Sequence, residues 1–315
     1  MHLLYGGFEF IIEEISFENM GVFMTVTLQN SKLKVVVNSK GAEINSFTKA
    51  DGKNIIWNGS PDIWKFHAPV LFPHCGKTKD GFVIIDDMKY PLKSNGFARD
   101  LEFKLVEQTD CSVKFELTEN EYTLERFPYR FRLSVKYVLM EDKLEFTTTV
   151  KNTGSEPFMF SAGSHSAFAI DDGVENYQIE FENKKPLRNV VCCENGLLAE
   201  NAEGKCPYVR DYGEAEPGII PVTAAGFGNG HLFTETDSAW VGLRNKKDGS
   251  IIKVNTKDYP YVMIWQNAGE PNFVCIEPWY GMPDADNTDH QWVKKPGLVK
   301  LDVGKKFSTD QSISV

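Results

Sequence analysis

The residues whose types and spacing best fit chemistry lie in the segment VCIEPWYG, residues 274–281. Here an apolar strand brings one carboxylate, that of Glu277, directly against the rings of Trp279 and Tyr280. A buried carboxylate is costly without a partner, and apolar surroundings raise its pKa toward the range in which it can act as a base. An ordinary ion pair at a strand end is the alternative, so Glu277 needs support from other residues.

A second candidate is His165, which lies in the small-residue segment FSAGSHSAF, residues 160–168. Small neighbours let other groups approach an imidazole closely, and this makes His165 the best candidate proton donor among the six histidines. A single histidine can equally be structural. A His and a Glu that are each framed by small or aromatic residues nevertheless form a candidate acid and base pair.

Two further segments carry polar side chains next to apolar runs. In APVLFPHCGK, residues 68–77, His74 and Lys77 follow the apolar run, and Lys77 is a candidate to hold a ligand oxygen. A lysine solvated at the head of a turn explains Lys77 equally well. The segment KSNGFARD, residues 93–100, adds the amide of Asn95 and the guanidinium of Arg99, although an Arg-Asp pair that ties a loop together is the alternative for Arg99.

Other kinds of site have weak support in the sequence. The histidines lie far apart and form no HxH or HExxH motif, so a zinc site is a weak hypothesis and no metal ligands are assigned. The segment 163–167, GSHSA, resembles the G-x-S-x-G motif of serine hydrolases only loosely. The glycine-rich segment 226–230 lacks the Lys-Ser/Thr that follows a phosphate-binding loop.

Strands must position these residues, because alternation of apolar and polar residues recurs along the chain. It is clearest at residues 101–105, 112–117, 131–138 and 143–147, and it returns at 240–243, 250–254 and 261–265. Turn residues separate the first four segments, which are therefore expected to be successive antiparallel strands. A short helix is expected after Ser60 and Pro61. No linker or repeat divides the chain, so one large β architecture is predicted.

Composition narrows the partners and the location. No apolar run approaches the roughly 20 residues of a membrane span. The formal charge of −10 argues against nucleic acid or an anionic membrane as a partner and favours a neutral small molecule. Six cysteines without CxxC spacing favour reduced thiols in a cytoplasm. Residues 1–22 lack a secretory signal and are expected to be an extension of uncertain order, followed by a single domain at 23–315.

Four segments in order along the chain resemble the aldose 1-epimerases, or galactose mutarotase-like proteins, and in particular their bacterial branch. The segments are WNGSP through HAPVLFP (57–61 and 67–73), GFARD (96–100), GSHSAF (163–168) and EPWYG (277–281). Each motif alone is moderately specific, whereas all four together are a strong match. The likeness covers about residues 24 to 312.

This resemblance implies a β-supersandwich of antiparallel sheets with few short helices, an open sugar-binding cleft and no metal or organic cofactor. It also implies interconversion of the α and β anomers of a hexose. By the same likeness, Glu277 takes the proton of the anomeric hydroxyl and His165 gives one to the ring oxygen, which opens the pyranose. Such a reaction is expected to use one acid and one base on opposite sides of a neutral sugar.

Aromatic residues are candidates for a flat wall on which the sugar lies. Trp279 is the strongest, because it follows Glu277 by two positions and so shares its side of an extended segment. Phe168, Trp265 and Tyr280 are further candidates, although aromatic residues in a β-rich protein commonly belong to the core.

The chain departs from the family pattern at two positions. Asn95 stands where relatives commonly have a histidine, and an amide cannot transfer a proton; His74 is a candidate to replace the lost ring sterically. Lys77 stands where the family usually has arginine, which exchanges a two-pronged donor for a single ammonium. Two alternatives therefore stay open: a hexose 6-phosphate substrate, held by Lys77 and Arg99, and a sugar-binding protein without turnover. A monomer and a homodimer are both compatible with the sequence.

Overall fold

The computed structural model describes residues 24–267, 269 and 272–315. Strands dominate it, and neighbouring strands of its sheets pair antiparallel. The all-β, antiparallel architecture expected from the sequence is confirmed. The expected N-terminal extension, residues 1–22, lies outside the described residues.

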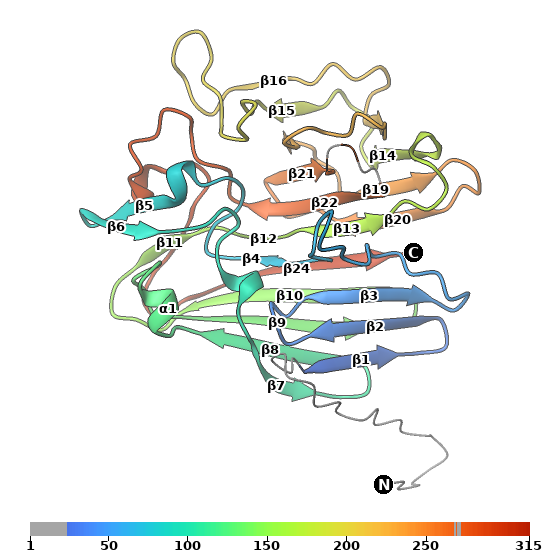
Figure 1. Ribbon diagram of the computed structural model, residues 1–315, viewed down its shortest axis with the longest axis horizontal. Helices are drawn as coiled ribbons and strands as arrows, with labels where there is room; N and C mark the ends of the chain where they lie inside the picture. The colour runs from blue at the N-terminus through green and yellow to red at the C-terminus, as the bar shows by residue number, and fades with distance from the viewer. Residues whose placement is uncertain (1–23, 268, 270–271) are drawn as a thin grey trace, which may run out of the picture.

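The larger sheet has nine strands, and the C-terminal strand lies inside it (Figure 1). Their order across the sheet is β17 (Ile219–Pro221), β14 (Tyr177–Phe181), β19 (Trp240–Asn245), β20 (Ile251–Asn255), β24 (Lys306–Ser314), β10 (Lys143–Asn152), β9 (Phe131–Leu139), β8 (Ser112–Thr118) and β7 (Lys104–Gln108). Because β24 pairs with both β20 and β10, it joins strands from the second half of the chain to strands from the first.

The second sheet has eight strands, and Glu277 lies in one of them, β22. Its order is β16 (Val209–Asp211), β15 (Arg188–Val190), β18 (His231–Thr234), β21 (Tyr261–Trp265), β22 (Phe273–Tyr280), β12 (Ala162–Ser164) and β4 (Val70–Leu71), with β13 (Ser166–Ala169) also paired to β22. The central strand β22 therefore contacts β21 on one edge and β12 and β13 on the other.

Three small sheets and a few short helices complete the described structure. The sheets are β1 (Thr25–Gln29), β2 (Leu33–Asn38) and β3 (Ile44–Lys49); β5 (Phe82–Ile85) and β6 (Met88–Pro91); and β11 (Phe158–Phe160) and β23 (Val299–Leu301). The helices are α1 (Glu121–Leu124) and the 3₁₀ turns η1 (Lys79–Gly81), η2 (Ala98–Asp100), η3 (Val174–Asn176) and η4 (Trp292–Lys294). None of the helices in the described residues has the length and apolar content that crossing a membrane requires.

The strands expected from alternation are largely confirmed. Residues 112–117, 131–138 and 143–147 fall in β8, β9 and β10, which are neighbours in the sheet, and β9 buries every second residue fully. The strand expected at 101–105 is wrong at its start, because β7 begins only at Lys104. Leu101 and Phe103 bond instead to the loop before β3, where Leu101 accepts from Gly41 and Phe103 donates to Ser39.

The helix expected after Ser60 is also wrong. Residues 61–63 form a turn, and the chain closes back on itself as a bridge between Ser60 and Trp64, whose carbonyl accepts from the Ser60 N–H. A strand-like bridge uses the backbone groups that a helix would need for its own first turn.

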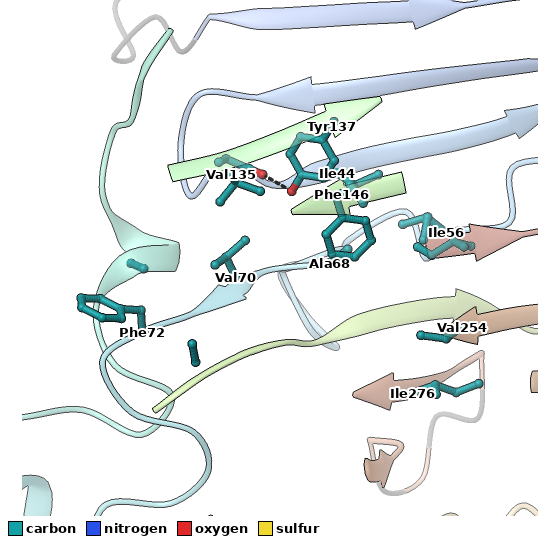
Figure 2. Close-up of a cluster of buried hydrophobic side chains, with 14 of the residues drawn as sticks. Ile44, Ile56, Ala68, Val70, Phe72, Val135, Tyr137, Phe146, Val254 and Ile276 are labelled. Atoms are coloured by element: carbon teal, nitrogen blue, oxygen red, sulfur yellow. Dashed lines mark hydrogen bonds between the residues drawn. The ribbon is translucent and has the colours of Figure 1, made fainter. Parts of the chain in front are cut away.

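The main core lies between the sheets. Figure 2 shows Ile44 of β3, Val70 of β4, Tyr137 of β9 and Ile276 of β22 among the buried side chains that meet there. The Tyr137 hydroxyl donates to the Ala42 carbonyl at 2.6 Å. One face of β22 thus packs into the main core, and its opposite face contacts residues outside that core.

Candidate active site

Alternation along β22 separates the core from the candidate site. Val274 and Ile276 join the main core, whereas Cys275 and Trp279 belong to two smaller clusters on the opposite face. Glu277 lies between Cys275 and Trp279 at a spacing of two residues, so it shares their face. Its side chain is completely buried.

The neighbouring strands bring His165 to Glu277. Gly163 pairs with Trp279 and Ser166 pairs with Ile276, so the same register places His165 opposite Glu277. His165 Nδ1 lies 3.4 Å from Glu277 Oε1. The structure thus has the candidate acid and base side by side, and not on opposite sides of the sugar as expected from the sequence.

A glycine makes this arrangement possible. A Cβ at Gly163 would lie 2.6 Å from Trp279 Cδ1 and 2.9 Å from the Pro278 carbonyl oxygen. The small-residue segment therefore permits a close approach, as the sequence suggested, and the group that approaches most closely is the Trp279 indole.

Aromatic rings surround His165. Trp64 stacks on it, with ring centroids 4.8 Å apart, and Trp265 meets it edge-on at 5.5 Å. Trp279 lies on the face of β22 that Glu277 shares, as the two-residue spacing predicts, and Met263 pairs with Glu277 from β21. These side chains form an apolar wall around the two titratable groups.

Burial sets the protonation of the pair. It raises the pKa of Glu277 well above its ordinary value, against the weaker opposing effects of the Arg99 charge and the Trp279 indole. Burial also lowers the pKa of His165 to about 3, and the Arg99 charge adds to this. Neither oxygen of Glu277 nor Nδ1 of His165 has a hydrogen-bond partner among the described residues. Buried polar atoms are normally paired, so these atoms have unused capacity for a ligand.

The positive charge of Arg99 acts on the pKa of both Glu277 and His165. Arg99 lies in η2, packs its guanidinium over the Phe66 ring at 4.5 Å and donates from Nη2 to the Ser94 carbonyl at 3.2 Å. Two buried acids, Glu43 and Glu277, act on its pKa from nearby, although burial is the largest influence and lowers it. Arg99 therefore belongs to the electrostatic surroundings of the catalytic candidate.

The side-chain oxygen of Asn95 is used in a structural hydrogen bond. Asn95 Oδ1 accepts from the Gly76 N–H at 2.7 Å, and the Asn95 N–H donates to the Gly76 carbonyl. The next residue, Gly96, has φ of +70°, and a Cβ there would lie 2.2 Å from the Phe72 carbonyl oxygen. The Asn95–Gly96 turn thus fastens the 72–76 segment against η2.

The structure places the other predicted residues in different surroundings. His74 is fully buried beside Trp292, and burial lowers its pKa to about 3. Lys77 is exposed, and its Cβ lies near Gly196 of the loop after β15. The described structure does not bring His74 or Lys77 into contact with His165 or Glu277.

Two aromatic candidates lie on the opposite side of the sheet from the pair. Phe168 pairs with Val274 and joins the main core. Tyr280 packs against Phe307 and Tyr259. Phe168 is three residues from His165, and Tyr280 is three residues from Glu277. An odd spacing along a strand puts side chains on opposite faces, so the sequence already distinguished these two residues from Trp279.

Two contributors to the site were not predicted. They are Trp64, for which the sequence indicates only a place in the expected short helix, and Glu43. Glu43 accepts the N–H groups of His67 at 2.6 Å and Ala68 at 3.0 Å, and the next residue, Pro69, accepts the His165 N–H at 3.0 Å. Glu43 therefore fixes the segment that holds the backbone of His165, a contact between distant residues that left no local signal.

Comparison with known proteins agrees with these motifs. The aldose 1-epimerase family profile matches residues 24–297. The plasmid-encoded protein LacX of Lactococcus lactis subsp. lactis is 27% identical over 298 residues, which cover 90% of this chain and 97% of that protein. This chain is thus similar to LacX over nearly the whole of both proteins.

Two solved structures share the fold. A galactose mutarotase related enzyme from Lactobacillus acidophilus is 29% identical, with a TM-score of 0.81, and the match covers 92% of this chain and 97% of that one. A galactose mutarotase-like protein from Lactobacillus casei is 27% identical, with a TM-score of 0.85 and coverage of 92% and 99%. The resemblance seen in the four sequence segments is confirmed, and this chain belongs to the aldose 1-epimerase family.

Proposed function

We propose that this protein is a sugar epimerase that interconverts the α and β anomers of a free hexose. The observation that carries the proposal is the buried pair of His165 and Glu277, 3.4 Å apart and without hydrogen-bond partners among the described residues. Membership of the aldose 1-epimerase family supports a reaction of this kind. The acidic chain and its six free cysteines support a neutral substrate and a cytoplasmic setting.

Adjacent side chains are sufficient for this reaction. The anomeric hydroxyl and the ring oxygen are both bonded to C1, so an acid and a base that lie side by side reach both. Glu277 accepts the hydroxyl proton while His165 gives a proton to the ring oxygen; the bond from C1 to the ring oxygen breaks and C1 becomes an aldehyde. After rotation about the C1–C2 bond, the reverse transfers close the other anomer. Each group contributes about 10²–10⁴-fold to the rate.

Burial determines which protonation state of the pair is favoured. Because burial raises the pKa of Glu277 and lowers that of His165, it favours the state of the pair with one proton, on the carboxyl group. A carboxylate beside an imidazolium holds the same number of protons, with the proton on His165 and not on Glu277. Sugar hydroxyls that donate to Glu277, together with the charge of Arg99, favour this second arrangement.

The remaining predicted residues have unequal support as sugar contacts. Trp279 shares the face of Glu277, and Arg99 influences its pKa, so both are proposed to contact the substrate. Trp64 and Trp265, which flank His165, are proposed to complete the apolar wall. For a hexose 6-phosphate substrate, Lys77 and Arg99 would have to hold the phosphate together, and the structure offers no contact between them.

The test is the rate of anomer equilibration. Freshly dissolved α-glucose and α-galactose are followed by polarimetry or NMR, with galactose 6-phosphate as a third substrate. The wild type is expected to accelerate equilibration of at least one free sugar, and Glu277→Gln is expected to lose about 10²–10⁴-fold of that acceleration. Glu180→Gln, which removes a buried carboxylate from β14 in the other sheet, is the matched control.

Binding measurements on the same samples separate the alternatives. If both free sugars bind but equilibrate no faster than in buffer, the protein binds sugars without epimerising them. If only the 6-phosphate is accelerated, the proposed substrate class is wrong.

A further inference from the structure

A third donor completes the surroundings of the proposed catalytic pair. Cys275 stands two residues before Glu277 on the same face of β22. One ring nitrogen of His165, the Cys275 thiol and a carboxylate oxygen of Glu277 all lie within 4.8 Å of one another. It is the one such group of three donors among the residues that the structure describes, and all three side chains are buried.

The separations are close to those that a single metal ion requires. Zinc holds sulfur at about 2.3 Å and nitrogen or oxygen at about 2.0–2.2 Å, so tetrahedral donors lie roughly 3.3–3.8 Å apart. His165 Nδ1 and Glu277 Oε1 already meet this spacing at 3.4 Å. Because the Cys275 thiol lies within 4.8 Å of the other two donor atoms, a movement of about 1 Å at most brings it to this spacing.

Charge also favours a divalent cation. Cys275 and Glu277 are both completely buried, where an isolated anion is costly. A dication that replaces their two protons, with neutral His165 as the third ligand, gives a group with no net charge. The Arg99 guanidinium is the one nearby positive charge that acts on the pKa of Glu277, and it opposes metal binding.

We propose that His165, Cys275 and Glu277 form a site for a thiophilic divalent cation of the zinc type. The thiolate, imidazole and carboxylate donor set suits zinc and cobalt and suits magnesium and calcium poorly. The site is inhibitory: the metal occupies both groups that proton transfer needs. Sequence spacing does not reveal it, because His165, between β12 and β13, is more than a hundred residues from Cys275 and Glu277 of β22.

Metal binding is tested first without sugar, so its outcome does not depend on the proposed activity. The full chain is titrated with Co²⁺, and a thiolate-to-cobalt charge-transfer band is expected, saturating at one ion per chain. The band should be lost in Cys275→Ser and in Cys275→Ala, and weakened at least tenfold in apparent affinity in Glu277→Gln. Two variants of Cys275 are used so that the test still works if one of them does not fold.

Controls identify the thiol. Cys75→Ser removes another fully buried cysteine, whose pKa the charge of Glu277 raises, and Cys192→Ser/Cys193→Ser removes the adjacent thiols of the loop after β15. Both variants should keep the band. Absence of a thiolate band in the wild type, or a band that survives in folded Cys275→Ala, would overturn the proposal.

Inhibition is tested second, with Zn²⁺ in the equilibration assay. Half-inhibition is expected at the dissociation constant measured by calorimetry, with full recovery after EDTA. A wild type that binds zinc at this site but catalyses no equilibration would refute the epimerase proposal and leave the metal site standing. Full activity with the site saturated would refute its inhibitory role.

Discussion

Trp64 lies against His165, with ring centroids 4.8 Å apart and planes 29° from parallel. Trp64 also stacks with Phe273, with ring centroids 5.5 Å apart. The imidazole therefore packs against a continuous layer of aromatic rings. Burial is the largest cause of the low pKa of His165. The stack therefore contributes to the burial that lowers the pKa of His165.

Removing this ring is expected to raise the pKa of His165. In Trp64→Ala, solvent reaches the imidazole and stabilises its charged form, so the pKa should move from about 3 toward the ordinary 6.5. NMR titration of the His165 ring measures the change. Trp240→Ala, on β19 of the other sheet, is the control. An unchanged His165 pKa in Trp64→Ala would mean that other residues exclude the solvent.

The rate of equilibration should fall at alkaline pH. The reactive pair holds one proton, and it loses that proton as pH rises through the raised pKa of Glu277. On the acid side, a second proton is gained only near the His165 pKa of about 3. The catalytic rate constant should therefore stay level through the range around pH 4.5, where an ordinary carboxyl group titrates, and should decline only at higher pH. A rate that climbs through weakly acid pH, as for a carboxylate with an ordinary pKa, would contradict this.

Glu43 should make stability depend on pH. Burial raises its pKa from 4.5 to about 7, so the folded protein keeps a proton that the unfolded chain releases. The stability present below pH 4.5 is lost as pH rises to 7, by about 3 kcal/mol. Glu43→Gln keeps the acceptor for His67 and Ala68 but has no charge. Its free energy of unfolding, relative to that of the wild type, should therefore increase by this amount between pH 4.5 and 8.

Urea unfolding at several pH values between 4.5 and 8 measures this difference for Glu43→Gln. Glu200→Gln, at an exposed position, is the control and should follow the wild type at every pH. A Glu43→Gln curve parallel to that of the wild type would show that Glu43 is ionised in the folded protein.

Removing one partner of the buried ion pair of Lys295 and Asp284 should destabilise the protein more than removing both. Lys295 Nζ lies 2.7 Å from Asp284 Oδ1, and the two side chains are 3% and 5% exposed. Lys295→Met leaves the carboxylate buried without its cation and should cost about 3–5 kcal/mol. The double variant with Asp284→Asn should lose less. Lys294→Met, in the adjacent exposed pair with Asp289, should hardly change the unfolding midpoint.

Chemical denaturation of the single and double variants forms a double-mutant cycle. If the loss in the double variant equals the sum of the two single losses, the partners are not coupled and the prediction is wrong.

Much of the fold was determined by the sequence itself. Alternation of apolar and polar residues defined β8, β9 and β10, because successive side chains of a strand point to opposite faces whatever the strand pairs with. The same rule put Trp279 on the side of Glu277, and it contained the signal that Phe168 and Tyr280 lie on the other side. Local backbone geometry is sufficient for such statements.

The site itself was decided by tertiary structure. His165 meets Glu277 because β12 and β13 pair with β22 in one register, and that register depends on contacts such as Gly163 with Trp279. Trp64 reaches His165 through a turn where the sequence indicated a helix. Packing between distant segments, which no local pattern encodes, thus turned a carboxylate and an imidazole from separate motifs into one buried pair.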